Sequence, residues 1–311
     1  MSVKAAPMAR PGASSRRRQQ GAWWRVLPNY LFVAPYLIAF LVLAGGPLLY
    51  TLYMSFFDRK IFDTNPPFIG LKNYTDLWTN DPLWITVLTN TIEFVVLTVI
   101  GVTLVALGAA LLLRRIVRGQ TVLRTILFAP AILSVAITAI IWQWLLAPDA
   151  GALNFLVGLV GIGKLPWTSD AGWAIPSLSL ATVWWNFGIP MIILLAGLLN
   201  IDATLYEAAS IDGAGAWRAF WSITLPLLRP TLLFVLVTQI IAQFQVFGQP
   251  AFITGGGPGD SSRTILMFLY DTVWRHFQYG YGAAIAITLA LIMGLITAVQ
   301  FGVLGRGSEV Y

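Results

Sequence analysis

The sequence predicts an all-α membrane protein that crosses the bilayer six times. Three observations predict this fold class: 58% of the 311 residues are hydrophobic, only 10% are charged, and the apolar residues gather in six long stretches. A soluble domain carries about 25% charged residues. A water-exposed surface cannot be assembled from so few charges. The composition therefore excludes soluble enzymes, disordered tails and secreted disulfide scaffolds.

The N-terminal tail, residues 1–28, carries six basic residues before the first apolar stretch, as many as the net charge of +6. Because this cluster adjoins a membrane span, we interpret it as a cytoplasmic flank that fixes orientation and not as a nucleic-acid site. A signal peptide also begins with basic residues, but its apolar part is only about 7–15 residues long. The stretch Tyr30–Phe57 is longer and no small-residue cleavage pattern follows it, so we expect a retained anchor.

Each apolar stretch is long enough to cross the membrane as a helix, which takes about 20 residues. Unpaired backbone groups are not tolerated in lipid, and the stretches lack the alternation of barrel strands, so helices are expected. Pro35, Pro47 and Pro190 are candidate kinks. The predicted spans are Tyr30–Phe57, Leu88–Leu113, Val122–Leu146, Trp173–Leu199, Leu227–Ile253 and Tyr281–Leu304. They form one domain over residues 29–305, with a C-terminal tail at 306–311.

The distribution of charge predicts the orientation. With the N-terminus inside, the inner segments hold 13 basic residues and the outer loops hold 6. Acidic residues show the opposite bias, with 8 outside and 4 inside. Cytoplasmic loops are enriched in Lys and Arg. Both termini are therefore expected in the cytoplasm, and the outer loops are expected to be polar, turn-rich linkers.

The inner loop between the fourth and fifth spans, residues 200–226, has a pattern of its own. Asp202 is placed to cap a short helix, and Gly213 is placed to end it in a left-handed conformation. A second short helix with an aromatic stripe follows, and Pro226 suits the first turn of the fifth span. Small residues, Ala208, Ala209, Ala214 and Gly215, leave the backbone open to close approach by another surface. An interfacial amphipathic linker is the alternative interpretation.

The spacing in this loop resembles the signature of ABC-importer permeases. That signature reads Glu-Ala-Ala, three residues, Gly, nine residues, Ile-x-Leu-Pro, and the chain matches it at Glu207, Ala208, Ala209, Gly213, Ile223, Leu225 and Pro226. The Asp212-Gly213-Ala214 element, Pro230, the outer Thr254–Pro258 segment and the Tyr279–Ala284 segment are similar to the sugar branch, the maltose-transporter (MalF-like) and glycerol-phosphate permease family. The resemblance covers roughly residues 30 to 305 and lacks the extra N-terminal spans and large outer domain of the longest members.

The resemblance implies a type I ABC importer permease fold in the bacterial inner membrane. The loop would couple to a cytoplasmic ATPase through Glu207, Ala208, Ala209, Asp212, Gly213, Ala214, Ile223, Leu225 and Pro226. The implied partners are two ABC ATPase subunits, a second homologous permease, an extracytoplasmic solute-binding protein, a sugar and membrane lipid. ATP and magnesium would be bound by the ATPase.

Catalytic chemistry is not expected in this chain. There is no cysteine and His276 is the only histidine, which excludes thiolate sites and paired-histidine zinc centres. The only Gly-Lys pair, Gly163-Lys164, is followed by Leu165, so there is no P-loop. Glu93 is the only acid within a predicted span; a proton relay is one interpretation, and pairing with Asn90 near the outer end is the other. We expect no enzyme activity and no cofactor bound by this chain.

Polar and aromatic residues in spans four and five are candidates for the solute pathway. They are Trp185, Asn186, Gln239, Gln243, Phe244 and Phe247. The amides suit sugar hydroxyls and the aromatic rings suit the apolar faces of a sugar; hydrogen bonding between helices is the alternative role. On a continuous helix, Gln245 and Gln249 would share a second face. No Arg or Lys falls within the interior of a span, which favours a neutral sugar, with a glycerol-phosphate ester or another polar solute as the alternative.

Overall fold

A computed structural model describes residues 22–116 and 118–304. Most of the expected N-terminal tail and the whole C-terminal tail at 306–311 lie outside the described residues. The described residues are helical apart from their connections and two isolated bridges, Phe57 with Phe68 and Lys60 with Gln278. The chain divides into two units, residues 1–50 and 51–311, and each is considered by itself.

The first unit contains α1 (Ala22–Phe40), the π-helical turn η1 (Leu41–Gly45) and the start of α2 (Gly46–Met54). The apolar run Phe32–Met54 is long enough to be a membrane span. The helix passes through Pro35 without a break, whereas the widened turn η1 lies directly before Pro47, where proline interrupts the regular hydrogen-bond pattern.

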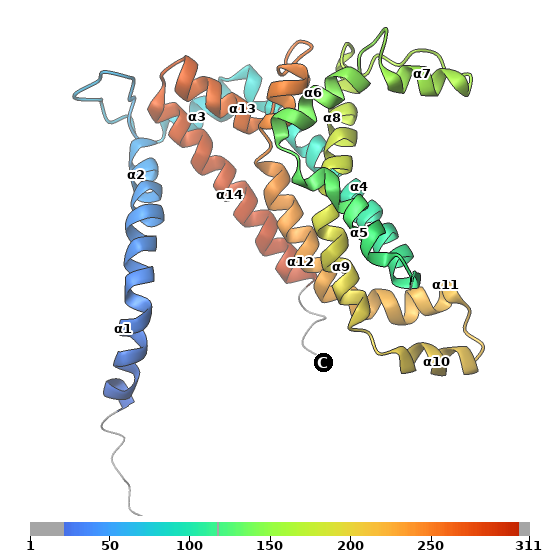
Figure 1. The fold of residues 1–311 in the computed structure, drawn as a ribbon. Coiled ribbons are helices and arrows are strands. Elements are labelled where there is room, and N and C mark those ends of the chain that lie inside the picture. The colour runs from blue at the N-terminus through green and yellow to red at the C-terminus, as the bar shows by residue number, and fades with distance from the viewer. Residues whose placement is uncertain (1–21, 117, 305–311) are drawn as a thin grey trace, which may run out of the picture. The chain divides into compact units, whose positions relative to one another are not determined.

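Three further helices in the second unit are long and apolar enough to cross a membrane. They are α4 (Pro82–Arg115), α14 (Tyr279–Leu304), and a continuous helix made of α11 (Ala216–Ala219), the π-helical turn η3 (Phe220–Thr224) and α12 (Leu225–Phe244). α4 packs along α8 (Ala171–Asn186) and α9 (Gly188–Leu199), and α12 packs against α4, α9 and α14 (Figure 1). With the first unit, four helices qualify as spans.

The remaining two spans are bent, and the sequence indicated a kink in only one of them, at Pro190. α5 (Gln120–Phe128), with the 3₁₀ turn η2 (Ala129–Ile132), meets α6 (Val135–Leu145) at 96°, and α8 meets α9 at 53°. The expectation of one continuous helix over 122–146 is therefore wrong, whereas the bend within 173–199 agrees with the kink expected at Pro190. Each bent pair counted as one span brings the number to six.

Local chemistry accounts for both bends. In the first pair, Leu133 is extended and the Ser134 hydroxyl accepts a hydrogen bond from the Ile137 N–H, which starts a new helix. In the second pair, Pro190 has no N–H to donate to the Asn186 carbonyl four residues earlier, so the hydrogen-bond ladder is interrupted where α9 begins.

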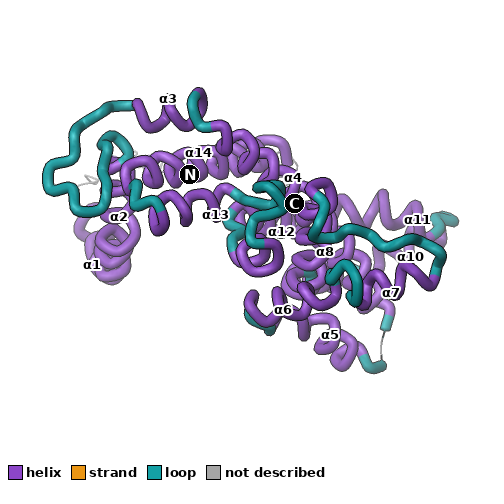
Figure 2. The backbone as a smooth tube through the Cα atoms, turned by 90° about the horizontal axis from the view of Figure 1, so that it is seen from above, coloured by secondary structure: helices purple, strands orange, loops and turns teal. Residues whose placement is uncertain are grey.

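The connections that the sequence places on the outer side are more ordered than polar linkers, which corrects that expectation. They contain α3 (Lys72–Thr79), α7 (Ala152–Leu159), α13 (Ile265–Tyr270) and two π-helical turns, η4 (Pro250–Thr254) and η5 (Asp271–Arg275). Leu77, Ile265 and Phe268 are buried in a core cluster with residues of α4, α12 and α14. α3 and α13 lie beside α14, and α6 lies near α8 (Figure 2).

A second core cluster joins the C-terminal half of α4 to α9 and α12, with Ala110, Leu198 and Leu228 fully buried. α9 and α12 approach closely at Gly197, where a Cβ atom would lie 2.7 Å from Thr231 Oγ1 and 2.9 Å from Leu228 Cδ1. This packing fixes the two helices from which the 200–226 loop projects. In Figure 1 its helices, α10 (Ala203–Ile211) and α11, lie at the end of the unit opposite α3, α7 and α13.

Candidate functional site

The first arm of the 200–226 loop is the short helix α10. The Asp202 carboxylate accepts a hydrogen bond from the Thr204 N–H at 2.9 Å, and this bond lowers the pKa of Asp202. At the other end, Gly213 has a positive φ of 78°, and the Ala214 N–H donates to the Ala209 carbonyl at 2.8 Å. The predicted cap, helix and glycine turn are confirmed.

The signature residues of this arm form a small, open knob. Glu207, Ala208, Asp212 and Gly213 are exposed. Glu207 forms no hydrogen bond or ion pair with any residue that the structure describes. Nothing lies within 4 Å of the position of a Cβ atom at Gly213, so glycine is required there by the backbone conformation and not by crowding. The knob presents a free carboxylate and an accessible backbone.

The second arm differs from the separate short helix that was expected. α11 continues through η3 into α12 without interruption, and Pro226 lies in the first turn of α12, as predicted. Ile223 packs against the α4–α9–α12 core and Thr224 is buried, while Leu225 is partly buried. The second arm is therefore continuous with a long helix of the membrane domain.

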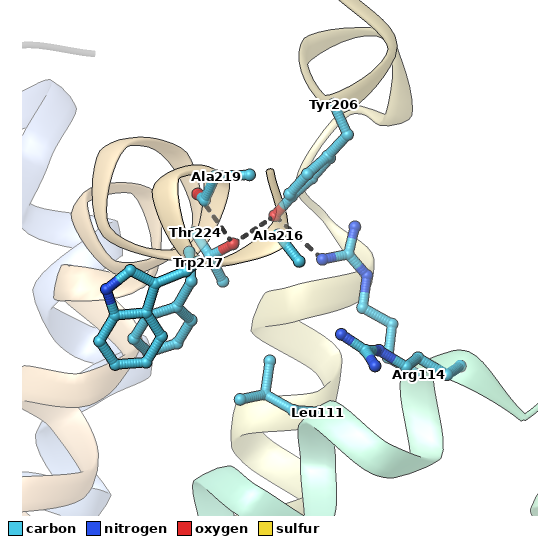
Figure 3. A pocket seen from close by; sticks show the side chains of 9 residues that line it. Leu111, Arg114, Tyr206, Ala216, Trp217, Ala219 and Thr224 are labelled. Carbon is cyan, nitrogen blue, oxygen red and sulfur yellow. Dashed lines mark hydrogen bonds between the residues drawn. The ribbon is translucent and has the colours of Figure 1, made fainter. Parts of the chain in front are cut away.

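The Tyr206 hydroxyl connects three elements of this region, a contact that was not predicted from the sequence. Arg114 Nη1, at the end of α4, donates to Tyr206 Oη at 2.9 Å, and its guanidinium carbon lies 4.5 Å from the centre of the Tyr206 ring. Tyr206 Oη also shares a hydrogen bond of 2.9 Å with Thr224 Oγ1 (Figure 3). We call these three residues the Arg114–Tyr206–Thr224 bracket. Because the partners are 92 and 18 residues apart, no local spacing could have revealed it.

A second group of the predicted residues meets in the membrane domain as an amide cluster. Asn186 Nδ2 donates to Gln239 Oε1 at 3.0 Å, and Gln243 Nε2 donates to the same oxygen at 3.1 Å. Gln239 and Gln243 are buried, with 7% and 4% of their surface exposed. The first bond links α8 to α12, which is the interhelical role left open by the sequence. The second lies within α12.

A cavity of about 370 Å³ adjoins this cluster. Its lining includes Trp185, Asn186, Gln243 and Phe247 among the predicted pathway residues. Gln239 is not among the lining residues and accepts hydrogen bonds from Asn186 and Gln243. Phe244, also predicted for the pathway, is buried in the core cluster with Val95 and Ile265 and does not line the cavity.

The cavity lies where three membrane helices break. α12 ends at Phe244, so the predicted continuous span 227–253 is wrong, and Gln245 and Gln249 do not share a helix face. Both still line the cavity, together with Val135 at the start of α6. The Trp185 Nε1–H donates to the Leu133 carbonyl at the first bend. Irregular backbone at membrane depth is tolerated where it lines a cavity or is buried in protein. This cavity is therefore the candidate solute site.

The remaining candidates lie apart from these two sites. Glu93 is exposed on α4 and has no hydrogen-bond or ion-pair partner in the described part of the chain. Asn90 does not pair with Glu93; its amide donates to the Asp260 and Arg263 carbonyls at 2.8 and 3.0 Å. His276 is exposed in an outer loop. Among the described residues, no cluster of His, Cys, Asp or Glu could hold a metal ion.

Comparison with known proteins finds a transport family and transport permeases that are similar to this chain over most of its length. Residues 102–306 match the family described as the binding-protein-dependent transport system inner membrane component. The chain is 36% identical to the probable ABC transporter permease protein YesP of Bacillus subtilis, covering 93% of this chain and 94% of YesP. It is 32% identical to the sulfoquinovosyl glycerol transport system permease protein SmoG of Agrobacterium fabrum, covering 88% and 89%.

The fold also matches a solved structure. This is a chain of a bacterial alginate ABC transporter in complex with an alginate pentasaccharide-bound periplasmic protein. The TM-score is 0.77 at 22% sequence identity, and the match covers 93% of this chain and 98% of the other. At this level of identity the likeness concerns the fold.

Proposed function

The chain belongs to the family of binding-protein-dependent transport system inner membrane components, and we propose that it is the permease subunit of an ATP-driven importer of a neutral carbohydrate. In this role the chain forms half of the translocation pathway. A second homologous permease forms the other half, two cytoplasmic ATPase subunits bind ATP and magnesium, and a solute-binding protein delivers the solute from outside. No covalent chemistry takes place in this chain.

The 200–226 loop supports the coupling part of the proposal. Its free carboxylate at Glu207 and its accessible backbone around Ala208 and Gly213 suit a docking groove with a basic residue. The second arm is continuous with α12, and the Arg114–Tyr206–Thr224 bracket ties the first arm to α4. A displacement of α10 by the ATPase would therefore move both α4 and α12. The coupling residues are those of the signature, Glu207 to Pro226, and the bracket is added to them.

The bent helices support alternating access. The α5–α6 and α8–α9 bends lie at Leu133 and Phe187, and residues adjacent to both bends line the candidate solute cavity. Domain motions of this kind concentrate changes of backbone angle at a few residues at the ends of elements. We propose that these two bends and the break after Phe244 change angle as the cavity opens to one side and then to the other.

The chemistry of the cavity lining carries the carbohydrate assignment. It presents the amides of Asn186, Gln243, Gln245 and Gln249 beside aromatic rings, and no charged side chain lines it. Amides donate and accept hydrogen bonds, as sugar hydroxyls require, while rings pack on the apolar faces of a sugar. An anionic solute would find no counter-charge in this part of the chain.

An anionic solute, such as a glycerol-phosphate ester, is the second candidate. The similarity to SmoG supports an anionic solute as this second candidate, because SmoG is named for the transport of sulfoquinovosyl glycerol, a sulfonate. Under this alternative the second permease subunit must supply the cationic groups that the cavity lacks.

Uptake into proteoliposomes tests the solute class. The complete complex is reconstituted with ATP inside the vesicles and the binding protein outside, and accumulation of a labelled neutral oligosaccharide is compared with that of labelled glycerol 3-phosphate. We expect ATP-dependent accumulation of the oligosaccharide, with vesicles lacking ATP as the control. Accumulation of glycerol 3-phosphate alone would reject the carbohydrate in favour of the anionic solute.

A further inference from the structure

A second cavity lies beside the 200–226 loop and is separate from the candidate solute site. Its volume is about 560 Å³, and it opens between the C-terminal end of α4 and the second arm of the loop (Figure 3). Leu111, Arg114 and Arg115 line it from α4, and Ala216, Trp217 and Phe220 line it from the second arm. The amide cluster has no member here, and the exposed signature residue Glu207 is not part of the lining.

The charges at one side of this cavity are unbalanced. Arg115 is exposed and forms no ion pair or hydrogen bond with any described residue. Arg114 is held in place by Tyr206, a neutral partner, so its charge is also uncompensated by any carboxylate. No acidic residue lines the cavity. Two cationic side chains that line one cavity with no carboxylate among the lining residues form a site for an anion, and guanidinium groups suit a phosphate.

The other walls of the cavity are apolar. Leu111, Ala216 and Phe220 form them, and Trp217 covers one side with 75% of its own surface exposed. The neighbouring Trp221 is also exposed, and its ring lies 5.6 Å from that of Trp217. A free phosphate would leave this apolar surface in contact with water. The lining therefore fits an occupant with an anionic head and a hydrocarbon tail.

The position of the cavity in the sequence pattern agrees with such an occupant. The apolar surface of α4 ends at Leu113, and the basic residues Arg114, Arg115 and Arg118 follow at once, as they do at a cytoplasmic membrane boundary. Exposed tryptophans are typical of the same level of the bilayer. We propose that this cavity binds one anionic phospholipid of the cytoplasmic leaflet, with its phosphate at Arg114 and Arg115 and an acyl chain along Leu111, Trp217 and Phe220.

The bound lipid has a consequence for coupling, which rests on the proposed function of the loop. Its headgroup contacts the same Arg114 that holds Tyr206, and its chain contacts the helix that begins with Ala216. A lipid in this position fastens the second arm to the end of α4. The lipid composition of the inner leaflet would thereby adjust how firmly the loop is held.

Lipid retention by the purified complex tests the proposal without measuring transport. The detergent-purified complex is incubated with dioleoyl phosphatidylglycerol, and the retained lipid is counted by native mass spectrometry while thermal unfolding is followed in parallel. We expect preferential retention of this lipid over dioleoyl phosphatidylcholine and a higher unfolding temperature in its presence. Inorganic phosphate, added in the same concentration range, is expected to give neither effect.

Three variants locate the site. Arg115→Gln is expected to weaken retention roughly fivefold, the effect of one basic residue at an anionic lipid surface, and Trp217→Ala is expected to weaken it as well. Arg124→Gln, which removes an exposed cation of the same inner segment outside the cavity, is expected to leave retention unchanged. All three are compared with the unaltered chain in lipid-free detergent, where equal unfolding temperatures show an intact fold.

The proposal is overturned if Arg115→Gln and Arg124→Gln weaken retention equally, which indicates diffuse attraction to the surface. It is also overturned if phosphatidylcholine is retained equally well, or if inorganic phosphate alone stabilises the complex as much as the lipid. None of these outcomes depends on uptake, so failure of the lipid site can be distinguished from failure of the transport function.

Discussion

At the scale of single residues, the Tyr206 hydroxyl joins α10 to both α4 and η3, and removing this one oxygen atom removes both connections. The hydroxyl accepts from Arg114 and shares a bond with Thr224, and both bonds are 2.9 Å long. We expect Tyr206→Phe to keep the ring beneath Arg114 and to lose both bonds. Each bond of this type contributes roughly 0.5–3 kcal/mol, more when one partner is charged. The sugar accumulated per ATP hydrolysed should fall several-fold, because the first arm is no longer fixed to α4 and α12.

Tyr270→Phe is the matched control for this prediction. The Tyr270 hydroxyl has no hydrogen bond to the described residues, and its ring, which the substitution keeps, packs on Phe247. Its ratio of uptake to hydrolysis should stay at the wild-type value. An unchanged ratio in Tyr206→Phe as well would mean that the bracket has no part in coupling.

The amide cluster allows the two roles of its members to be separated. The bond from Gln243 lies within α12, whereas the bond from Asn186 to Gln239 joins two helices. We expect Gln243→Ala to raise the solute concentration for half-maximal uptake several-fold, since a neutral hydrogen bond contributes about 0.5–1.5 kcal/mol. Its unfolding temperature should change little.

Gln239→Leu provides the contrast, because it removes the acceptor shared by Asn186 and Gln243. A lower unfolding temperature of the complex is expected for this variant. If Gln243→Ala instead lowers the unfolding temperature and leaves half-saturation unchanged, Gln243 serves to pack helices and our assignment to the pathway fails.

The sequence predicted the residues of the loop better than it predicted their contacts. The cap at Asp202 and the turn at Gly213 depend on neighbours within a few residues, so local chemistry was sufficient to find them. The bracket depends on Arg114 meeting Tyr206 across 92 residues of chain. Phe244 was assigned to the pathway because it is next to Gln243, but the break that follows it leaves its side chain in the core.

At the scale of helices, the contact between α9 and α12 decides how the loop is held. Gly197→Val should destabilise the protein by about 1–3 kcal/mol through overpacking, because its Cβ atom would lie within 3 Å of Thr231 and Leu228 side-chain atoms. Gly108→Val on α4 is the matched control, since nothing lies within 4 Å of its Cβ position. Thermal unfolding of the purified complex measures both.

A second substitution tests whether the contact is the cause. Combining Gly197→Val with Thr231→Ala removes the nearest atom and should recover part of the lost unfolding temperature. Equal unfolding temperatures for Gly197→Val and Gly108→Val would show that α9 and α12 are not in close contact in the assembled protein.

Hydropathy predicted how many membrane segments exist but not which ones are bent. A search for about 20 consecutive apolar residues tests only length and composition. The α5–α6 and α8–α9 segments pass this test as the straight helices do. Pro190 did indicate the second bend. The first depends on Leu133 becoming extended while Trp185 of another helix donates to its carbonyl, a contact that no local pattern contains.

At the scale of the whole molecule, the charge bias predicts which face meets the cytoplasm. The absence of native cysteine allows two single cysteines to report it. Ser169→Cys, exposed in an outer loop, should react with a membrane-impermeant thiol reagent in intact cells. Thr121→Cys, exposed at the start of α5, should react only after the cells are opened. Reaction of Thr121→Cys in intact cells would show that the orientation is the reverse of the predicted one. The 200–226 loop would then lie outside the cell.

Coupling through the 200–226 loop is the central claim, and charge reversal at Glu207 tests it most directly. Glu207→Lys should leave insertion and the unfolding temperature unchanged, because the side chain is exposed and has no partner among the described residues. Docking of the ATPase should weaken, since a like charge placed at a contact costs several kcal/mol.

The measurement is ATP-driven uptake of the neutral oligosaccharide by proteoliposomes containing the complete complex. Uptake is expected to fall roughly tenfold or more in Glu207→Lys, because the new lysine repels the basic residue proposed in the docking groove. In Glu207→Gln, which only removes the charge, uptake should fall by less. Thr121→Lys, which changes the charge by one unit on the cytoplasmic face outside the loop, should transport at the wild-type rate. Wild-type uptake by Glu207→Lys, with normal amounts of inserted protein, would contradict the assignment of this loop as the contact with the ATPase.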